Sequence, residues 1–282
     1  MDPFQTSKAL PLLSVADLRI HFSDLDEEVV HGISFAVASG ETVALIGESG
    51  SGKSVTALAV TRLLPPRETR VSGSIDFQGK NLLQLPAKEL LSIRGRRIAY
   101  IFQEPGASLN PSLTIGYQMS EILEGLSQKE RLEKIRQHLR DVGILDTERC
   151  RRSYPHELSG GMQQRVMIAM AILQQPDLLI ADEPTTALDV TLQKQILDLL
   201  KELQAQRHFA ILIITHNLLL VSHFADRTLV MFRGHIVEAG ETKALLQEQK
   251  HPYTQALFQC IPRFRHKHQE LNPIDYAKLG IA

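Results

Sequence analysis

A glycine-rich turn between an apolar strand and a helix constrains the fold of this chain more than any other feature. Residues 42–46 form a short, continuous apolar run of the kind found in buried strands. The turn at residues 47–54 follows directly, and residues 54–64 then have a helical pattern that stops at Pro65 and Pro66. Because a strand that leads through a tight turn into a helix is the unit from which parallel sheets are built, we expect an α/β fold.

Strands and helices continue to alternate along the chain. Alternating apolar and polar residues at 18–22 and 33–37 predict a small antiparallel sheet near the start. Between residues 110 and 155, apolar residues at helical spacing predict a helical insert. The other expected elements are hairpins at 73–83 and 229–238, the latter turning at Gly234; strands at 98–102, 178–181 and 210–214; and helices at 115–126, 129–142 and 191–206.

These patterns indicate one folding unit with internal divisions, since 282 residues suffice for a large α/β domain that carries an insert. We expect the N-terminal β subdomain and the glycine-rich part of the core in residues 12–97. The helical subdomain is expected in residues 98–177, the second part of the core in 178–245 and a tail in 246–282.

Composition excludes several classes of protein. The net charge of −1 gives no electrostatic reason to expect a nucleic-acid partner. Cys150 and Cys260 are the only cysteines, too few and too distant in sequence for a disulfide framework or a cysteine metal site. The first residues do not have the pattern of a secretory signal, and no apolar run approaches the roughly 20 residues that cross a bilayer. We therefore expect any membrane role to come through partners.

The glycine-rich turn has the composition of a phosphate-binding loop. Its sequence, Gly-Glu-Ser-Gly-Ser-Gly-Lys-Ser, matches the P-loop pattern in the required strand-to-helix context. Its backbone N–H groups and the helix start favour phosphate, Lys53 reaches the phosphates, and Ser54 can bind Mg²⁺. The candidate nucleotide-binding residues of this loop are Gly47, Glu48, Ser49, Gly50, Ser51, Gly52, Lys53 and Ser54.

A pair of carboxylates supplies the second half of the candidate site. Asp182 and Glu183 follow the apolar strand at residues 178–181, and ligands of open α/β sheets bind at the carboxyl ends of the strands. We expect Asp182 to hold Mg²⁺ through water. Glu183, one residue further, is placed to act as a general base or to orient the attacking water.

A third motif indicates the family. Residues 158–165 read Leu-Ser-Gly-Gly-Met-Gln-Gln-Arg, which resembles the LSGGQ signature of the ABC-transporter ATPases, with Met162 as a departure. The resemblance implies an ABC-type P-loop ATPase domain with an N-terminal antiparallel β subdomain and a helical subdomain that carries the signature. It also implies that Ser159, Gly160 and Gly161 contact the γ-phosphate held by a second subunit, so that two ATP molecules join a head-to-tail dimer.

Other markers of this family occur in the expected order. By resemblance, Gln103 is the Q-loop glutamine that senses Mg²⁺ and the attacking water, Asp189 is the D-loop residue, and His216 is the switch histidine on the γ-phosphate. Asn217 stands where many relatives have aspartate, which alters the local charge. Phe22 is a candidate for stacking on adenine, with a position in the core as the alternative.

Details narrow the resemblance to the ATPases of oligopeptide, dipeptide and nickel importers. The motifs that carry it are at residues 47–54, 103–105, 108–111, 181–189 and 251–254. They imply a peripheral subunit at the cytoplasmic face of the inner membrane. Its expected partners are a second ATPase, the same or different, two permeases and, indirectly, an extracytoplasmic binding protein.

Three alternatives stay open at this point. The first is an importer of nickel or another small solute, because the cargo is chosen by other proteins. The second is a non-transport ABC-type clamp, although such proteins usually have two ABC units or a long coiled coil. The third is a nucleotide-binding scaffold without turnover, which Glu183 and His216 argue against.

The end of the chain departs from the family. Many members continue into a cysteine-bearing tail, which in some of them ligates an iron–sulfur cluster, but residues 263–282 contain no cysteine. We therefore expect ATP and Mg²⁺, and no iron–sulfur cluster. The basic stretch at residues 263–268 is a candidate contact for lipid or a permease, with a solvated charged face as the alternative.

Overall fold

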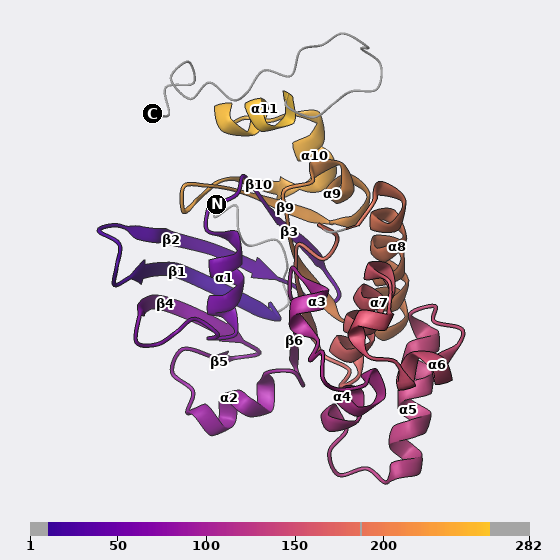
Figure 1. Cartoon of the computed structure of the whole chain (residues 1–282). Helices are drawn as coiled ribbons and strands as arrows, with labels where there is room; N and C mark the ends of the chain where they lie inside the picture. Colours follow the sequence, from indigo (N-terminus) through magenta and orange to yellow (C-terminus); the bar gives the residue numbers. More distant parts are fainter. Residues whose placement is uncertain (1–10, 187, 260–282) are drawn as a thin grey trace. The chain divides into compact units, whose positions relative to one another are not determined.

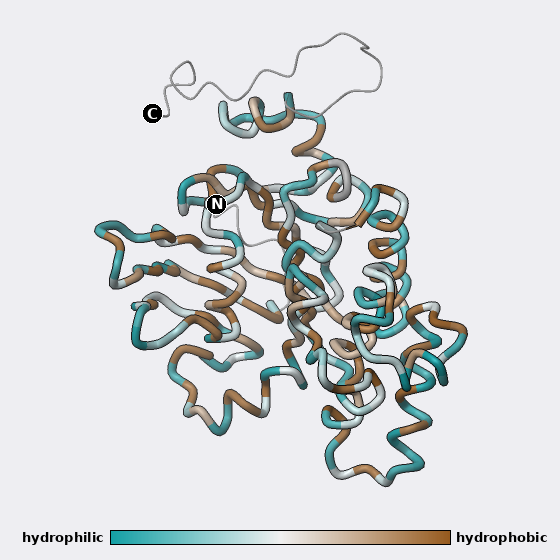
Figure 2. The backbone as a smooth tube through the Cα atoms, viewed as in Figure 1, coloured by the Kyte–Doolittle hydropathy of each residue, from teal (hydrophilic) through white to brown (hydrophobic). Residues whose placement is uncertain are grey.

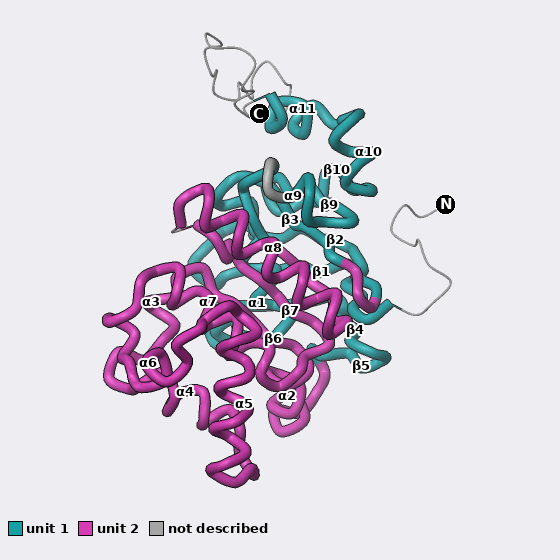
Figure 3. Tube along the Cα trace, turned by 90° about the vertical axis from the view of Figure 1, so that its right-hand side faces the viewer, with its two compact units in different colours: residues 1–38, 42–83, 214–282 teal, residues 39–41, 84–213 magenta. Residues whose placement is uncertain are grey.

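The computed structural model describes residues 11–186 and 188–259 (Figure 1). Its chain divides into two compact units (Figure 3). Unit 1 comprises residues 1–38, 42–83 and 214–282, and unit 2 comprises residues 39–41 and 84–213. Cys260 and residues 263–282, which include the basic stretch and were expected to hold no cluster, lie outside the described residues.

Unit 1 begins with the antiparallel sheet predicted from alternation. Its strands lie in the order β2 (Glu28–Val37), β1 (Leu13–Phe22), β4 (Thr69–Phe77) and β5 (Lys80–Asn81). Strand β1 starts five residues before the predicted segment because its register shifts after Val15, where Asp17 has a φ of 46°. This bulge resets the alternation, so the sequence pattern shows only the second half of the strand.

Three further strands of unit 1 carry the glycine-rich turn and the C-terminal hairpin. β3 (Thr42–Ile46) lies parallel to β9 (Arg227–Phe232), and β10 (His235–Glu241) pairs antiparallel with β9. The hairpin turns at Arg233 and Gly234, both with positive φ, as the glycine predicted.

Helices α1 (Lys53–Val60), α9 (Leu218–Phe224), α10 (Thr242–Gln247) and α11 (Pro252–Gln259) complete unit 1. Helix α1 ends four residues before the predicted position at residue 64. Arg62, with a φ of 51°, takes the left-handed conformation that ends the helix before Pro65 does.

Unit 2 contains the neighbouring strands β8 (Ala210–Thr215), β7 (Leu178–Asp182) and β6 (Ile98–Ile101), although the last two residues of β8 belong to unit 1. β6 and β7 are parallel, in agreement with the expected α/β arrangement. Figure 2 shows hydrophobic residues along the strands and mixed colours along the outer helices. The long helices of this unit are α8 (Val190–Arg207), α5 (Gln128–Asp141) and α7 (Gly160–Ile172).

The predicted helical insert is present. α4 (Ile115–Ile122) and α5 (Gln128–Asp141) occupy the expected segments, and α5 begins at a capping box between Ser127 and Glu130. The sequence did not predict the short α-helices of unit 2, because they are shorter than a reliable periodic pattern: α2 (Ala87–Ile93), α3 (Pro105–Ser108) and α6 (Thr147–Arg152). It also did not predict α9 and α11 of unit 1. Among the described residues, no helix combines the length and the apolar character needed to span a bilayer.

Candidate functional site

The glycine-rich turn in unit 1 joins β3 to α1 in a conformation that needs glycine. Gly52, the N-cap of α1, has a φ of 102°. A Cβ atom on Gly47 would lie 2.1 Å from the carbonyl oxygen of Met231 on β9. Both observations explain why side chains are absent at these positions. Ser49 and Gly50 lie exposed at the tip of the turn, and Ser54 is half-buried in the first turn of α1.

Lys53 lies over the inside of this turn. Its side chain is buried, and Nζ donates a hydrogen bond of 2.6 Å to the carbonyl oxygen of Glu48 and one of 3.3 Å to Oγ of Ser51. The ammonium group is therefore positioned by the loop itself, within the space that the loop encloses. The role of Lys53 in binding phosphate stays a prediction.

Two other candidates belong to unit 1. His216 is exposed directly after Thr215, the last residue of β8, and the backbone N–H of Asn217 donates a 3.0 Å hydrogen bond to Oγ1 of Thr215. This short turn fixes the chain direction at His216.

Phe22 is half-buried at the end of β1, where it pairs with Thr69. Its stacking role stays a prediction.

The predicted carboxylates lie in unit 2 at the end of β7. Asp182 is buried, and Oδ2 accepts a 2.9 Å hydrogen bond from the hydroxyl of Tyr100 on β6. Burial, followed by the charge and the hydrogen bond of Asp182, raises the pKa of Tyr100 far above its ordinary value. Tyr100 therefore stays protonated and remains a donor to Asp182.

Glu183 is held by two side chains on one oxygen. Its Oε2 accepts a 3.1 Å hydrogen bond from Nε2 of Gln103 and a 2.6 Å bond from Oγ1 of Thr186. Its backbone has a φ of 46°, a conformation that is uncommon for residues other than glycine and is concentrated at functional sites. The structure thus brings together Gln103 and Glu183, two of the predicted catalytic residues.

The signature residues form the start of α7. Ser159 is its N-cap, with Oγ accepting a 3.3 Å hydrogen bond from the N–H of Met162. Gly160 and Gly161 are the first helical residues. Nε2 of Gln163 donates hydrogen bonds to the carbonyl oxygens of Pro155 and Leu158. These bonds fix the segment that precedes α7.

Asp189 has a visible structural role in the same unit. It caps α8, and Oδ1 accepts a 2.9 Å hydrogen bond from the N–H of Leu192. Its predicted part in joining two subunits stays a prediction, and Ala187 beside it lies outside the described residues.

Three residues of these sites were missed by sequence reasoning. Tyr100 carried a signal, since a hydroxyl on a buried strand needs a partner. Thr186 carried none of its own. Tyr253, whose hydroxyl accepts a 3.1 Å hydrogen bond from the N–H of Glu48, lies in the His-Pro-Tyr-Thr segment that was noted only as a family marker.

Comparison with known families gives two matches. Residues 30–186 match the family described as ABC transporter. Residues 237–279 match the C-terminal region of oligopeptide and dipeptide transporters.

Curated relatives agree over most of the chain. The dipeptide transport ATP-binding protein DppD of Haemophilus influenzae is 48% identical over 260 residues, which cover 90% of this chain and 79% of the relative. The DppD protein of Bacillus subtilis is 45% identical, over 94% of this chain and 81% of the relative.

Solved structures show the same fold. The cbiO1 protein of Clostridium perfringens, part of the ABC transporter complex cbiONQ, has a TM-score of 0.74 at 29% identity, covering 85% of this chain and 92% of that protein. A dimeric ATP-binding cassette in a post-hydrolysis state, bound to ADP and Pi, has a TM-score of 0.72 at 26% identity, covering 82% and 98%.

Proposed function

This chain belongs to the ABC transporter family of ATP-binding subunits, and from this membership we propose that it is the ATP-hydrolysing motor of an importer for dipeptides or oligopeptides. The peptide cargo is proposed from the relatives' names and from the match of residues 237–279. We further propose two permeases as its partners at the cytoplasmic face of the membrane, with a binding protein that delivers the peptide.

The observation that carries the hydrolytic role is the fixed position of Glu183. Its Oε2 is shared by Gln103 and Thr186, so the carboxylate is oriented before any substrate arrives. A general base must be oriented in this way to take a proton from an attacking water. We assign this role to Glu183, a water-sensing role to Gln103 and a γ-phosphate contact to His216.

The remaining nucleotide and metal roles follow the chemistry of each side chain. Residues 47–54 are proposed to bind the phosphates of ATP, with Lys53 moving from the Glu48 carbonyl to phosphate. A buried carboxylate such as Asp182 suits a hard cation, and Mg²⁺ takes oxygen ligands. Mg²⁺ would help to neutralise the phosphate charge, with Ser54, Gln103 and Asp182 as its proposed ligands.

The two signature glycines support a partner outside the chain. Among the described residues, a Cβ atom on Gly160 would meet Leu188 at 3.9 Å, and one on Gly161 would meet Leu192 at 3.5 Å, both ordinary contacts. Glycine in a helix costs up to about 1 kcal/mol relative to alanine, and no contact within the described part of unit 2 requires it here. We propose that the requirement comes from ATP on a second subunit, which approaches the start of α7 in a head-to-tail dimer.

The test is to purify the tagged chain from membranes, identify the proteins that accompany it, and compare the wild type with Glu183→Gln. We expect permeases to copurify, and we expect the variant to bind ATP while losing at least about 99% of its turnover, as for loss of a general base. Glu202→Gln, an exposed glutamate on α8, is the matched control and should keep its activity. Unchanged turnover in Glu183→Gln would remove this residue from the mechanism, and a soluble complex without permeases would refute the transporter role.

A further inference from the structure

The C-terminal part of unit 1 reaches the glycine-rich turn through a buried tyrosine. The side chain of Tyr253, at the start of α11, is fully buried. Its hydroxyl accepts a 3.1 Å hydrogen bond from the N–H of Glu48, which is 205 residues away in the sequence. The carbonyl oxygen of the same Glu48 accepts the 2.6 Å hydrogen bond from Nζ of Lys53. Glu48 is therefore held by Tyr253 through its N–H group, and it holds Lys53 through its carbonyl oxygen.

The position of Tyr253 is fixed by its surroundings on the C-terminal hairpin. Its ring packs against Phe232 of β9, with centroids 4.2 Å apart. The carboxylate of Glu238 on β10 accepts hydrogen bonds from the N–H groups of Lys250 (2.8 Å) and His251 (3.1 Å), just before α11. The start of the helix is thus anchored to β10.

The ionisation of Glu238 reflects this anchoring. Burial raises the pKa of Glu238, but the nearby Thr254 hydroxyl and the two backbone N–H groups outweigh burial and leave the pKa below its ordinary value. The carboxylate therefore stays charged at neutral pH and keeps its hold on the segment.

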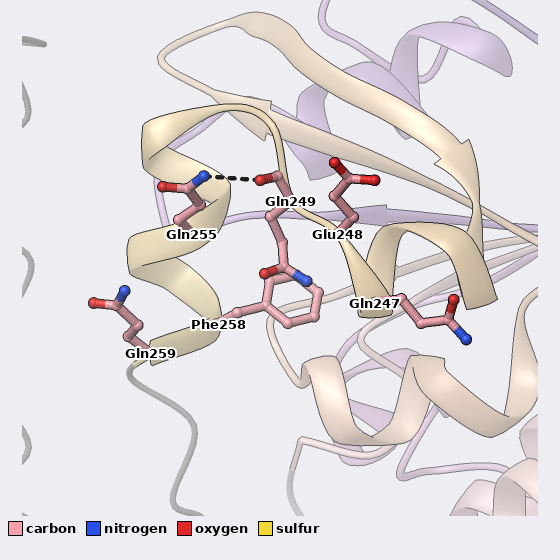
Figure 4. A pocket seen from close by; sticks show the side chains of 6 residues that line it. All are labelled: Gln247, Glu248, Gln249, Gln255, Phe258 and Gln259. Carbon is pink, nitrogen blue, oxygen red and sulfur yellow. Dashed lines mark hydrogen bonds between the residues drawn. The ribbon is translucent and has the colours of Figure 1, made fainter.

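A second contact joins α11 to the strand that leads into the turn. Phe258, one helical turn and a half after Tyr253, lines a small apolar space together with Ile46, the last residue of β3, and Leu218 and Leu245. Phe258 also borders an open, polar pocket of about 350 Å³ between α10 and α11 (Figure 4). The pocket is lined by Gln247, Glu248, Gln249, Gln255, Phe258 and Gln259. Helix α11 thus bonds to Glu48 through Tyr253 and shares an apolar space with Ile46 through Phe258.

We propose that Tyr253 is a positioning residue of the nucleotide site, which fixes Glu48 through its backbone N–H and thereby places the Glu48 carbonyl oxygen that holds Lys53. The inference rests on the proposed binding of ATP phosphates by residues 47–54. When phosphate takes over Lys53, the hydrogen bond that the Glu48 N–H donates to Tyr253 keeps Glu48 in place, so the turn does not have to be ordered by the nucleotide. Without the hydroxyl this hydrogen bond is lost, and part of the binding energy is spent on ordering the loop.

The first test is Tyr253→Phe, which removes only the hydroxyl and keeps the ring against Phe232. We expect KM for ATP, and Kd for ATP measured in a Glu183→Gln background, to rise about 3- to 10-fold, the range expected for one lost hydrogen bond. We expect kcat to stay within about twofold, because the group does not touch the reacting atoms. Tyr117→Phe, an exposed tyrosine of α4, is the matched control and should change neither constant.

Three outcomes separate the possibilities. An unchanged KM and Kd in a folded Tyr253→Phe protein overturns the inference and leaves the proposed ATPase role standing. A fall in kcat that follows a loss of thermal stability, with Kd unchanged, also overturns it, since the role is then structural. A wild-type protein that does not hydrolyse ATP refutes the proposed function instead.

A second variant covers the case in which Tyr253→Phe does not fold. Glu238→Gln weakens the anchor of the same segment from β10 and leaves Tyr253 intact. We expect a smaller rise of Kd in the same direction, about two- to threefold, because an amide is a weaker acceptor than a carboxylate. An unchanged Kd for ATP in this variant would contradict the inference if the N–H groups of Lys250 and His251 no longer bond to the side chain at position 238.

Discussion

The hydroxyl of Tyr100 on β6 donates a 2.9 Å hydrogen bond to Oδ2 of Asp182, the last residue of the neighbouring strand β7. The bond orients a buried carboxylate at the carboxyl end of a parallel pair of strands. Partners of this kind fix the direction in which a carboxylate presents its other oxygen to a cation.

Tyr100→Phe should therefore raise the Mg²⁺ requirement of the ATPase. The substitution keeps the ring contact with Phe102, whose centroid lies 4.5 Å away, and removes only the donor. We expect the Mg²⁺ concentration for half-maximal hydrolysis to rise about tenfold, as for other lost supports of a metal ligand. A titration of Mg²⁺ at saturating ATP measures it, and an unchanged midpoint would contradict the assignment of Asp182.

Thr186 is predicted to matter for turnover through Glu183. Thr186→Val removes the 2.6 Å bond to Oε2 and keeps the bond from Gln103, so we expect kcat to fall about tenfold because the general base is less well positioned. Thr186→Ser restores the hydroxyl and should recover most of the rate. Equal rates in the valine and serine variants would show that the hydroxyl has no part in positioning Glu183.

Gly161→Ala should separate stability from activity. A Cβ atom at this position makes only ordinary contacts with Leu192, and alanine is the better helix former, so we expect the free energy of unfolding to rise by up to about 1 kcal/mol. ATP hydrolysis should fall at least about tenfold, because the added methyl group obstructs the proposed nucleotide of the second subunit. Asp198→Ala, on the exposed side of α8, offers a similar gain in helix propensity as a control and should keep full activity.

The stability of unit 2 should depend on the protonation of His138. Nδ1 of this buried ring donates to the carbonyl oxygen of Lys134, and Nε2 accepts from Arg207, which requires the neutral ring. Burial, and then the charge of Arg207, keeps the pKa of His138 below its ordinary value of 6.5. Below about pH 6.5 the unfolded chain binds a proton that the folded chain does not, so stability is lost as pH falls.

The measurement is the urea midpoint of unfolding between pH 8 and pH 5.5, for the wild type and for His138→Gln. An amide can replace both hydrogen bonds without titrating, so the variant should lose less stability on acidification. If the two proteins show the same pH dependence, His138 is not the group responsible.

The sequence predicted the local structure around the candidate residues, for a physical reason. Gly47 and Gly52 stand where the backbone excludes side chains, and Asp182 and Glu183 follow an apolar strand, so short motifs are tied to short-range geometry. The beginning of β1 was not predicted, because the bulge at Asp17 interrupts the alternation that identifies a strand.

Contacts between distant residues were beyond the reach of such patterns. Tyr253 and Glu48 are 205 residues apart in the sequence, and the fold brings them into contact. Tyr100 and Asp182 meet because their strands are neighbours in the sheet. Neither pairing has a local sequence signal, since it depends on which elements the fold places side by side.

The buried thiol of Cys150 in α6 has a practical consequence for measuring motion. Burial, and then the charge of Asp146, raises the pKa of this thiol to about 11, so it reacts slowly with alkylating reagents at neutral pH. The chain has one other cysteine, Cys260. A single Cys260→Ser substitution would therefore leave a background nearly silent to maleimide dyes. Fluorescent labels on introduced surface cysteines, one in each unit, could then follow the distance between the units through a cycle of ATP binding and hydrolysis.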